Sequence, residues 1–304
     1  MAPSGAPAGN LLAKLMRRIL FLLTVMAIGA AAVVLFPRPM NAGPAFTAMS
    51  YNIGNNQPPQ PTTDNVVRII RSSVTPDILL LQDAAWAVTT KDLAERLGYP
   101  YYASSRELSP GSNLGILSRY PLSNPDVMHF EPERDRRPAA ICVDGIIGGQ
   151  SVLLCSAHLP SLSATLRQAD RAGGGRLLTL INIGAGELLA DTPRSDSARK
   201  LMAWISARHA RTTVLGGDFN SLPLSKAVRI ITRELDDASW PSRAYFRGTY
   251  RGGDFPLQPR IDYLFHSGDL HSLGAGVIGQ TAGDHYPVYA AFRLPAQPVA
   301  AAVR

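Results

Sequence analysis

The stretch Gly216-Gly217-Asp218-Phe219-Asn220-Ser221-Leu222-Pro223 decides the interpretation of this chain. The run 211–215 before it is β-branched and aliphatic, as a buried strand would be, and the glycines, Asp, Asn and Pro end that strand abruptly. Asp218 and Asn220 are therefore expected at the carboxyl end of a core strand, where α/β folds commonly place ligand-binding groups. A carboxylate can bind a hard cation or take a proton, and an amide can hold a phosphate oxygen. The alternative is a plain Asx-rich turn.

The composition is that of a globular chain with a large core, since 46% of the 304 residues are hydrophobic and 17% are charged. The formal net charge is +7. Four of the 30 basic residues and none of the 23 acidic residues precede residue 41, so residues 41–304 carry 26 basic and 23 acidic side chains, a net of +3. So mild a balance does not by itself indicate a nucleic-acid-binding protein.

An uncharged apolar run covers residues 19–36 and is near the minimum length of a membrane-spanning helix. Three basic residues lie just before it, so the positive-inside rule predicts a cytoplasmic tail at 1–18, a signal anchor at 19–36 and an extracytoplasmic remainder. The alternative is a signal peptide cleaved near 43–45, which would release a secreted protein. Both interpretations place the main domain outside the cytoplasm.

The two cysteines lie in a predicted hairpin. The runs 141–147 and 150–155 flank Gly148-Gly149, a strong two-residue hairpin signal. With residue 147 opposite residue 150, Cys142 faces Cys155 in a non-hydrogen-bonded pair, where side chains lie closer together. Such a pair can form a disulfide in an oxidising compartment, and the alternative is two reduced core cysteines.

Other apolar runs predict further strands and helices. Strands are expected at 45–53, 78–83, 114–117, 260–265 and 288–294, and helices at 92–97 and 227–235. This pattern leaves eight polar residues at the carboxyl ends of strands: Asn52, Asp83, His158, Asp218, Asn220, Asp262, Asp284 and His285. One such residue would be explained as a cap, but eight together indicate a shared cation or phosphate.

In their order, these motifs resemble those of the endonuclease/exonuclease/phosphatase superfamily, whose members hydrolyse phosphoester bonds with Mg²⁺ or Mn²⁺. The resemblance covers residues 46–294, between a linker at 37–45 and a flexible tail at 295–304. The motifs are Ser50-Tyr51-Asn52-Ile53, Pro76-Asp77-Ile78 through Leu81-Gln82-Asp83, Leu117-Ser118-Arg119-Tyr120-Pro121, His158-Leu159, Gly217-Asp218-Phe219-Asn220, Arg260-Ile261-Asp262-Tyr263 and Asp284-His285-Tyr286-Pro287-Val288. The resemblance implies a four-layer α/β sandwich of two facing mixed β-sheets flanked by helices, with the site at one end.

The resemblance also implies which residues bind the metal and the phosphate. Asn52 and Asp83 would hold Mg²⁺ or Mn²⁺, with Asp284 close by. Asn220, together with Asn52, would bind a phosphate oxygen. This set suits the metal, because Mg²⁺ prefers one or two carboxylates with water and substrate phosphate.

Proton transfer would fall to the remaining residues. Asp218 would orient or deprotonate the attacking water. His285, held by Asp262, would handle protons or stabilise the pentavalent transition state, since a neighbouring carboxylate fixes the tautomer of His and raises its basicity. His158 would donate to a non-bridging oxygen.

Two departures from the family pattern bear on activity. The family has Gln-Glu where this chain has Gln82-Asp83, so the metal carboxylate is one methylene shorter. The deoxyribonuclease-like branch has Arg-Glu-Pro-Ala, whose Glu supports the first His, where this chain has Arg136-Arg137-Pro138-Ala139. The second departure argues against a double-strand DNA nuclease of that type.

These features lead to a hypothesis of a membrane-anchored, extracytoplasmic, metal-dependent phosphodiesterase whose substrate is nucleic acid or a phospholipid headgroup. Anchoring at residues 19–36 favours lipid, whereas the modest positive charge and the many arginines favour nucleic acid. The alternative function is a non-catalytic phosphate- or partner-binding domain whose metal site is weakened by Asp83.

Overall fold

The first β-sheet is built around the apolar strand β1 (Ala45–Asn52), which is parallel to β2 (Ile78–Gln82) and antiparallel to β12 (Val288–Arg293). Its strand order is β11-β12-β1-β2-β4-β3. The remaining strands are β3 (Tyr101–Ser104), β4 (Gly115–Ser118) and β11 (His271–Val277). The computed structural model describes residues 43–54, 59–85, 88–131, 138–161, 186–251 and 258–296.

The second sheet has the strand order β5-β6-β7-β8-β10-β9. At its centre, β7 (Gln150–His158) is parallel to β8 (Thr213–Asp218), and β8 is antiparallel to β10 (Asp262–His266). The remaining strands are β5 (Leu122–His129), β6 (Ala139–Ile147) and β9 (Asp236–Asp237). Both sheets therefore mix parallel and antiparallel pairs, as the sequence predicts.

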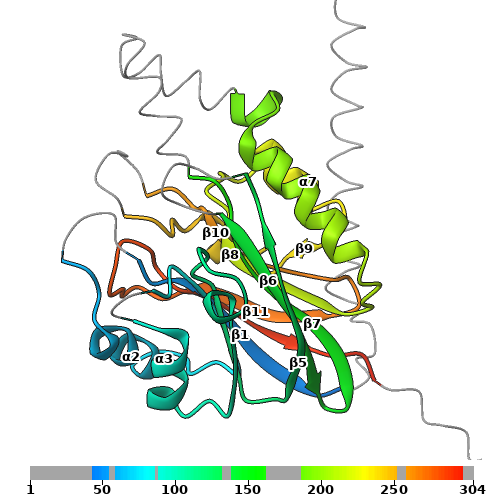
Figure 1. Cartoon of the computed structure of the whole chain (residues 1–304). Coiled ribbons are helices and arrows are strands. Elements are labelled where there is room, and N and C mark those ends of the chain that lie inside the picture. The colour runs from blue at the N-terminus through cyan, green and yellow to red at the C-terminus, as the bar shows by residue number, and fades with distance from the viewer. Residues whose placement is uncertain are drawn as a thin grey trace, which may run out of the picture. The chain divides into compact units, whose positions relative to one another are not determined.

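The two sheets face each other across one apolar core, which joins side chains such as Leu80 and Phe292 of the first sheet to Val214 and Leu264 of the second. The helices α2 (Thr63–Arg71) and α3 (Thr90–Leu97) pack on the outer face of the first sheet (Figure 1). The helices α7 (Pro193–Ser206) and α8 (Lys226–Ile231) pack on the outer face of the second. The short elements α4 (Ser105–Leu108) and η1 (Arg243–Phe246) lie in connections. This is the predicted arrangement of facing sheets with flanking helices.

The cysteine hairpin has the predicted register. Ile147 pairs with Gln150 across the Gly148-Gly149 turn, and Cys142 pairs with Cys155. The two glycines have φ values of 55° and 78°, which are left-handed values that favour glycine. The sulfur atoms form a disulfide between β6 and β7, so of the two alternatives the oxidised pair is confirmed.

The seven strands and helices predicted by residue range are all present, with bounds that differ from the predicted ones by one to four residues at one end or both. Two of these differences show where other contacts replace the expected ones. The helix predicted at 227–235 ends at Ile231, and Leu235 is reached by a single further turn in which its amide donates to Ile231 O. The strand predicted from residue 260 begins at Asp262, because the amides of Ile261 and Asp262 both donate to Thr249 Oγ1 instead of to a neighbouring strand.

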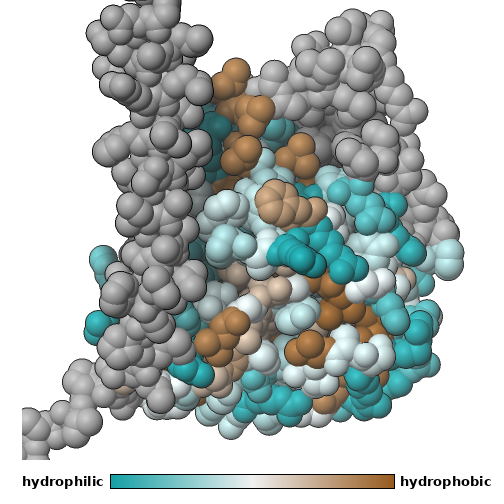
Figure 2. All heavy atoms as spheres, turned by 180° about the vertical axis from the view of Figure 1, so that it is seen from behind, coloured by the Kyte–Doolittle hydropathy of each residue, from teal (hydrophilic) through white to brown (hydrophobic). Residues whose placement is uncertain are grey.

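Among the described residues, no helix is long and apolar enough to cross a membrane. The predicted tail at 1–18 and anchor at 19–36, as well as Arg136 and Arg137, lie outside those residues, and nothing in the structure tests cleavage near 43–45, so these expectations stay predictions. The face opposite to the view of Figure 1 exposes hydrophobic side chains among hydrophilic ones (Figure 2).

Candidate active site

Six of the eight predicted residues lie at one edge of the two sheets because of strand direction. Three strands end at a predicted residue: β1 at Asn52, β7 at His158 and β8 at Asp218. Asp83 follows the last residue of β2, and Asn220 follows β8. Asp262 is instead the first residue of β10, which corrects its predicted place at a carboxyl end. Because β10 is antiparallel to β8, Asp262 pairs with Asp218, and the amino end of one strand meets the carboxyl end of the other.

The other two residues, Asp284 and His285, are also on the amino side of a strand. They lie in the loop before β12, which is antiparallel to β1. Their predicted place at a carboxyl end is therefore wrong, but the antiparallel pairing still brings them to the shared edge.

Asp218 is the centre of the cluster, and its side chain is only 2% exposed. Its Oδ2 accepts a hydrogen bond of 3.0 Å from Asn52 Nδ2. The same oxygen lies 3.4 Å from His158 Nε2 and 3.6 Å from His285 Nε2. Its Oδ1 accepts from the amide of Asn220 at 2.9 Å. One buried carboxylate therefore joins two imidazoles and two asparagines from both sheets.

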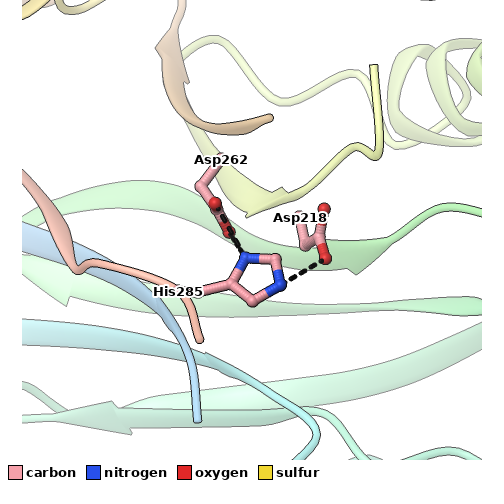
Figure 3. Close-up of side chains that lie close together, drawn as sticks. All are labelled: Asp218, Asp262 and His285. Atoms are coloured by element: carbon pink, nitrogen blue, oxygen red, sulfur yellow. Dashed lines mark hydrogen bonds and ion pairs between the residues drawn. The ribbon is translucent and has the colours of Figure 1, made fainter. Parts of the chain in front are cut away.

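His285 lies between two carboxylates (Figure 3). Its Nδ1 is 2.9 Å and 3.1 Å from the two oxygens of Asp262, and its Nε2 faces Asp218. Burial alone would lower the pKa of His285, but the charges of Asp262 and Asp218 raise that pKa to about 10. Burial raises the pKa of Asp262 to about 6, although the charge of His285 opposes this. The two groups therefore share one proton, which the hydrogen bond between Nδ1 and the Asp262 carboxylate holds in place.

His158 also contacts two carboxylates, because its Nδ1 lies 3.4 Å from Asp83 Oδ1 while its Nε2 faces Asp218. Burial would lower the pKa of His158, but the charges of Asp83 and Asp218 raise it above the ordinary value. Asp83 itself adopts the left-handed region with φ of 56°. A non-glycine residue held there at a polar cluster is the kind of local strain that marks functional sites.

Asn220 shows the same backbone feature, with φ of 48°. Its Nδ2 donates to the carbonyl of Leu159 at 3.0 Å, which fixes the loop after β8 to the loop after β7. Asp284 lies at the other side of the cluster, with its Oδ1 3.9 Å from His285 Nε2. The structure thus brings all eight predicted residues into one connected group.

The site offers two places where a divalent cation could be held. The first is beside Gly54, where an added Cβ would lie 2.7 Å from Asp83 Oδ2 and 3.2 Å from Asn52 Oδ1. Two oxygen ligands from β1 and the end of β2 therefore flank one small space that only glycine leaves open. Carboxylate and amide oxygens are the ligands that Mg²⁺ and Mn²⁺ accept, so these residues fit such an ion.

The second place is the buried group Asp218, Asp262 and His285, whose potential ligand atoms all lie within 4.8 Å of one another. Here both ring nitrogens of His285 already face carboxylates, Nδ1 that of Asp262 and Nε2 that of Asp218. This group is therefore better suited to holding a proton than to holding a cation.

Three further residues at the site are not among the eight predicted ones. Thr249 Oγ1 accepts from the amide of Asp262, and the ring of Tyr250 lies 4.8 Å from the ring of His285. Below the cluster, buried Gln82 joins the sheets by donating to Ser156 Oγ at 2.9 Å. Of these, only Gln82 lies in a recognisable motif, whereas Thr249 and Tyr250 come from a connection whose position depends on pairing with residues distant in sequence.

Solved structures with the same fold come from several organisms. An endonuclease/exonuclease/phosphatase from Beutenbergia cavernae shares 20% identity over 84% of this chain and 73% of that chain, with a TM-score of 0.61. A mannosyl-6-phosphatase from Bacteroides thetaiotaomicron shares 16% identity over 81% of this chain and 99% of that chain, with a TM-score of 0.59. Truncated TDP2 from Caenorhabditis elegans shares 19% identity over 82% of this chain and 97% of that chain, with a TM-score of 0.55. No curated protein matches the sequence.

The facing sheets and the polar cluster at their edge define a class of protein, the metal-dependent hydrolases of phosphoester bonds. Residues 49–285 match the profile of the Endonuclease/Exonuclease/phosphatase family. The chain belongs to this family. The resemblance predicted from the sequence motifs is therefore confirmed.

Proposed function

We propose that this protein is a membrane-anchored, extracytoplasmic phosphodiesterase that uses Mg²⁺ or Mn²⁺ and acts on nucleic acid or on a phospholipid headgroup. The observation that supports this most is the buried Asp218 carboxylate, whose Oδ2 is approached by Asn52, His158 and His285. Such a carboxylate, aligned by fixed donors, is suited to orienting and deprotonating a water molecule.

Asp83 and Asn52 would hold the cation beside Gly54, with Asp284 nearby. When bound, the ion would offset the negative charge that grows on the phosphoryl oxygens. The chain's own side chains would do the rest: His285, kept protonated by Asp262, would stabilise the pentavalent transition state, and His158 would donate to a non-bridging oxygen. Asn220, whose backbone amide donates a hydrogen bond to Asp218 Oδ1, would hold a phosphate oxygen.

The proposed location rests on two sequence features and one contact. The apolar run at 19–36 and the basic residues before it predict an anchor with the domain exported. The Cys142–Cys155 disulfide is typical of an oxidising compartment.

One observation favours the alternative of a non-catalytic binding domain. Asp83 is shorter than the family's Glu, and its Oδ1 lies 3.4 Å from His158 Nδ1. The same carboxylate would therefore interact with both this His and any bound cation. A weaker metal site would follow.

The test uses the full chain in detergent and measures hydrolysis of bis- and mono-p-nitrophenyl phosphate in the presence of Mg²⁺, Mn²⁺ or a chelator. DNA, RNA and sphingomyelin are then tested as substrates. Both simple esters are needed because one structural neighbour is named a mannosyl-6-phosphatase. The proposal predicts turnover of the diester that disappears with chelator and in Asp218→Ala. Turnover that is absent with every substrate, or unchanged in Asp218→Ala, would support the binding domain instead.

A further inference from the structure

A short segment near the site, Trp240–Arg247, exposes unusually large apolar side chains. The exposed fraction is 62% for Trp240 and 82% for Phe246. Between residues 238 and 251 the chain has three arginines and no acidic residue. Large exposed aromatic side chains with a single sign of charge around them are typical of interaction surfaces.

This segment has ring contacts and an ion pair beneath it. The ring of Tyr245 lies 5.0 Å from that of Trp240 and 5.3 Å from that of Phe246. Buried Arg260 lies 5.0 Å from the centre of the Tyr245 ring, and both its terminal nitrogens donate to the Asp237 carboxylate at 2.8 Å. The exposed rings are therefore supported by a buried ion pair at the start of β10, and little side-chain entropy remains to be lost on binding.

The segment carries two arginines that are exposed. The guanidinium groups of Arg243 and Arg247 form no hydrogen bond or ion pair with any residue that the structure describes. These two cations beside two protruding apolar side chains match a partner that is anionic at its surface and apolar beneath it.

We propose that the segment Trp240–Arg247 docks onto the surface of an anionic phospholipid bilayer. Trp and Phe insert at the boundary between headgroups and acyl chains, while Arg243 and Arg247 remain at the level of the lipid phosphates. Single-stranded nucleic acid fits less well, because residues 41–304 carry a net charge of only +3.

Docking there brings the bilayer close to the catalytic cluster. The segment continues into Thr249, which accepts from the amide of Asp262, and into Tyr250, which forms a β-bridge with His285. This inference does not rest on the proposed catalytic activity, since it concerns binding alone.

The experiment measures the tryptophan fluorescence of the full chain with vesicles whose acyl chains are brominated, because bromine quenches only tryptophans that reach the lipid. The chain has three tryptophans, Trp86, Trp204 and Trp240, and none of them lies within the predicted anchor. Vesicles of phosphatidylcholine with phosphatidylglycerol are compared with vesicles of phosphatidylcholine alone. Trp240→Phe is the test variant, and Trp204→Phe, in α7, is the matched control.

The proposal predicts that vesicles containing phosphatidylglycerol quench the wild type and Trp204→Phe, and that most of this quenching is lost in Trp240→Phe. It also predicts that the double variant Arg243→Gln/Arg247→Gln loses the dependence on phosphatidylglycerol. Equal quenching of wild type and Trp240→Phe would overturn the proposal. So would a change in Trp240 fluorescence on adding a single-stranded oligonucleotide, or on raising protein concentration, with no response to vesicles.

Discussion

Replacing Gly54 by Ala places a methyl group between the two proposed metal ligands. The backbone at Gly54 lies outside the left-handed region, so the backbone conformation itself is open to Ala, and the effect of the methyl group falls on Asp83. Its Cβ would lie 2.7 Å from Asp83 Oδ2, whereas ordinary van der Waals contact begins at 3.4 Å. The Asp83 carboxylate must therefore move by about 0.7 Å, the difference between these distances. Mg²⁺ demands near-ideal octahedral geometry with oxygens at about 2.0–2.1 Å, so a shift of this size removes a good ligand position.

We expect the Mg²⁺ concentration for half-maximal hydrolysis of bis-p-nitrophenyl phosphate to rise about 10- to 100-fold, the range typical when a metal ligand is disturbed through its neighbours. The assay is initial rate against Mg²⁺ concentration. The control is Gly268→Ala, where the nearest atom to an added Cβ is Asp236 Oδ2 at 3.8 Å. If Gly54→Ala requires no more Mg²⁺ than Gly268→Ala, Asp83 and Asn52 are not the metal ligands.

Three further predictions concern the proton pair and the disulfide. Asp262→Asn removes a charge that raises the pKa of His285 to about 10. We therefore expect kcat to fall by roughly 10²–10⁴-fold and the alkaline limb of the pH–rate profile to move to lower pH. The measurement is kcat as a function of pH. Because the folded-state pKa of His285 is raised above 6.5, its stabilisation is fully present below pH 6.5 and is lost as pH rises towards 10. The difference in Tm between wild type and His285→Gln, both without metal, should therefore shrink over that interval. Replacing Cys142 and Cys155 by Ala should lower the free energy of unfolding by about 2–4 kcal/mol in urea titrations, and an unchanged midpoint would contradict that.

The local sequence determines the parts of the fold that short-range physics controls. The Gly148-Gly149 turn sets the hairpin register, and that register alone predicts that Cys142 lies opposite Cys155. Likewise, polar residues that end apolar runs, such as Asn52 and Asp218, could be predicted to lie at strand ends, since a core strand cannot continue through them.

Contacts between segments distant in sequence could not be predicted in this way. The position of Asp262 at an amino end follows from its antiparallel pairing with Asp218, which the strand's own residues do not specify. The contact of Tyr250 with His285 depends on a connection of irregular structure, and no periodicity reports it. The approach of Asp83 to His158 joins residues of different sheets, so it too is a property of the assembled fold.

The measurement that tests the site most directly is a titration of the full chain with Mn²⁺, in which electron paramagnetic resonance monitors the concentration of the free ion. Our account predicts one bound Mn²⁺ per chain, strongly weakened binding in Asp83→Ala, and retained binding in Asp262→Ala, because Asp262 holds the proton of His285. Binding that survives Asp83→Ala but disappears in Asp262→Ala would contradict it, since the cation would then occupy the buried group of Asp218, Asp262 and His285.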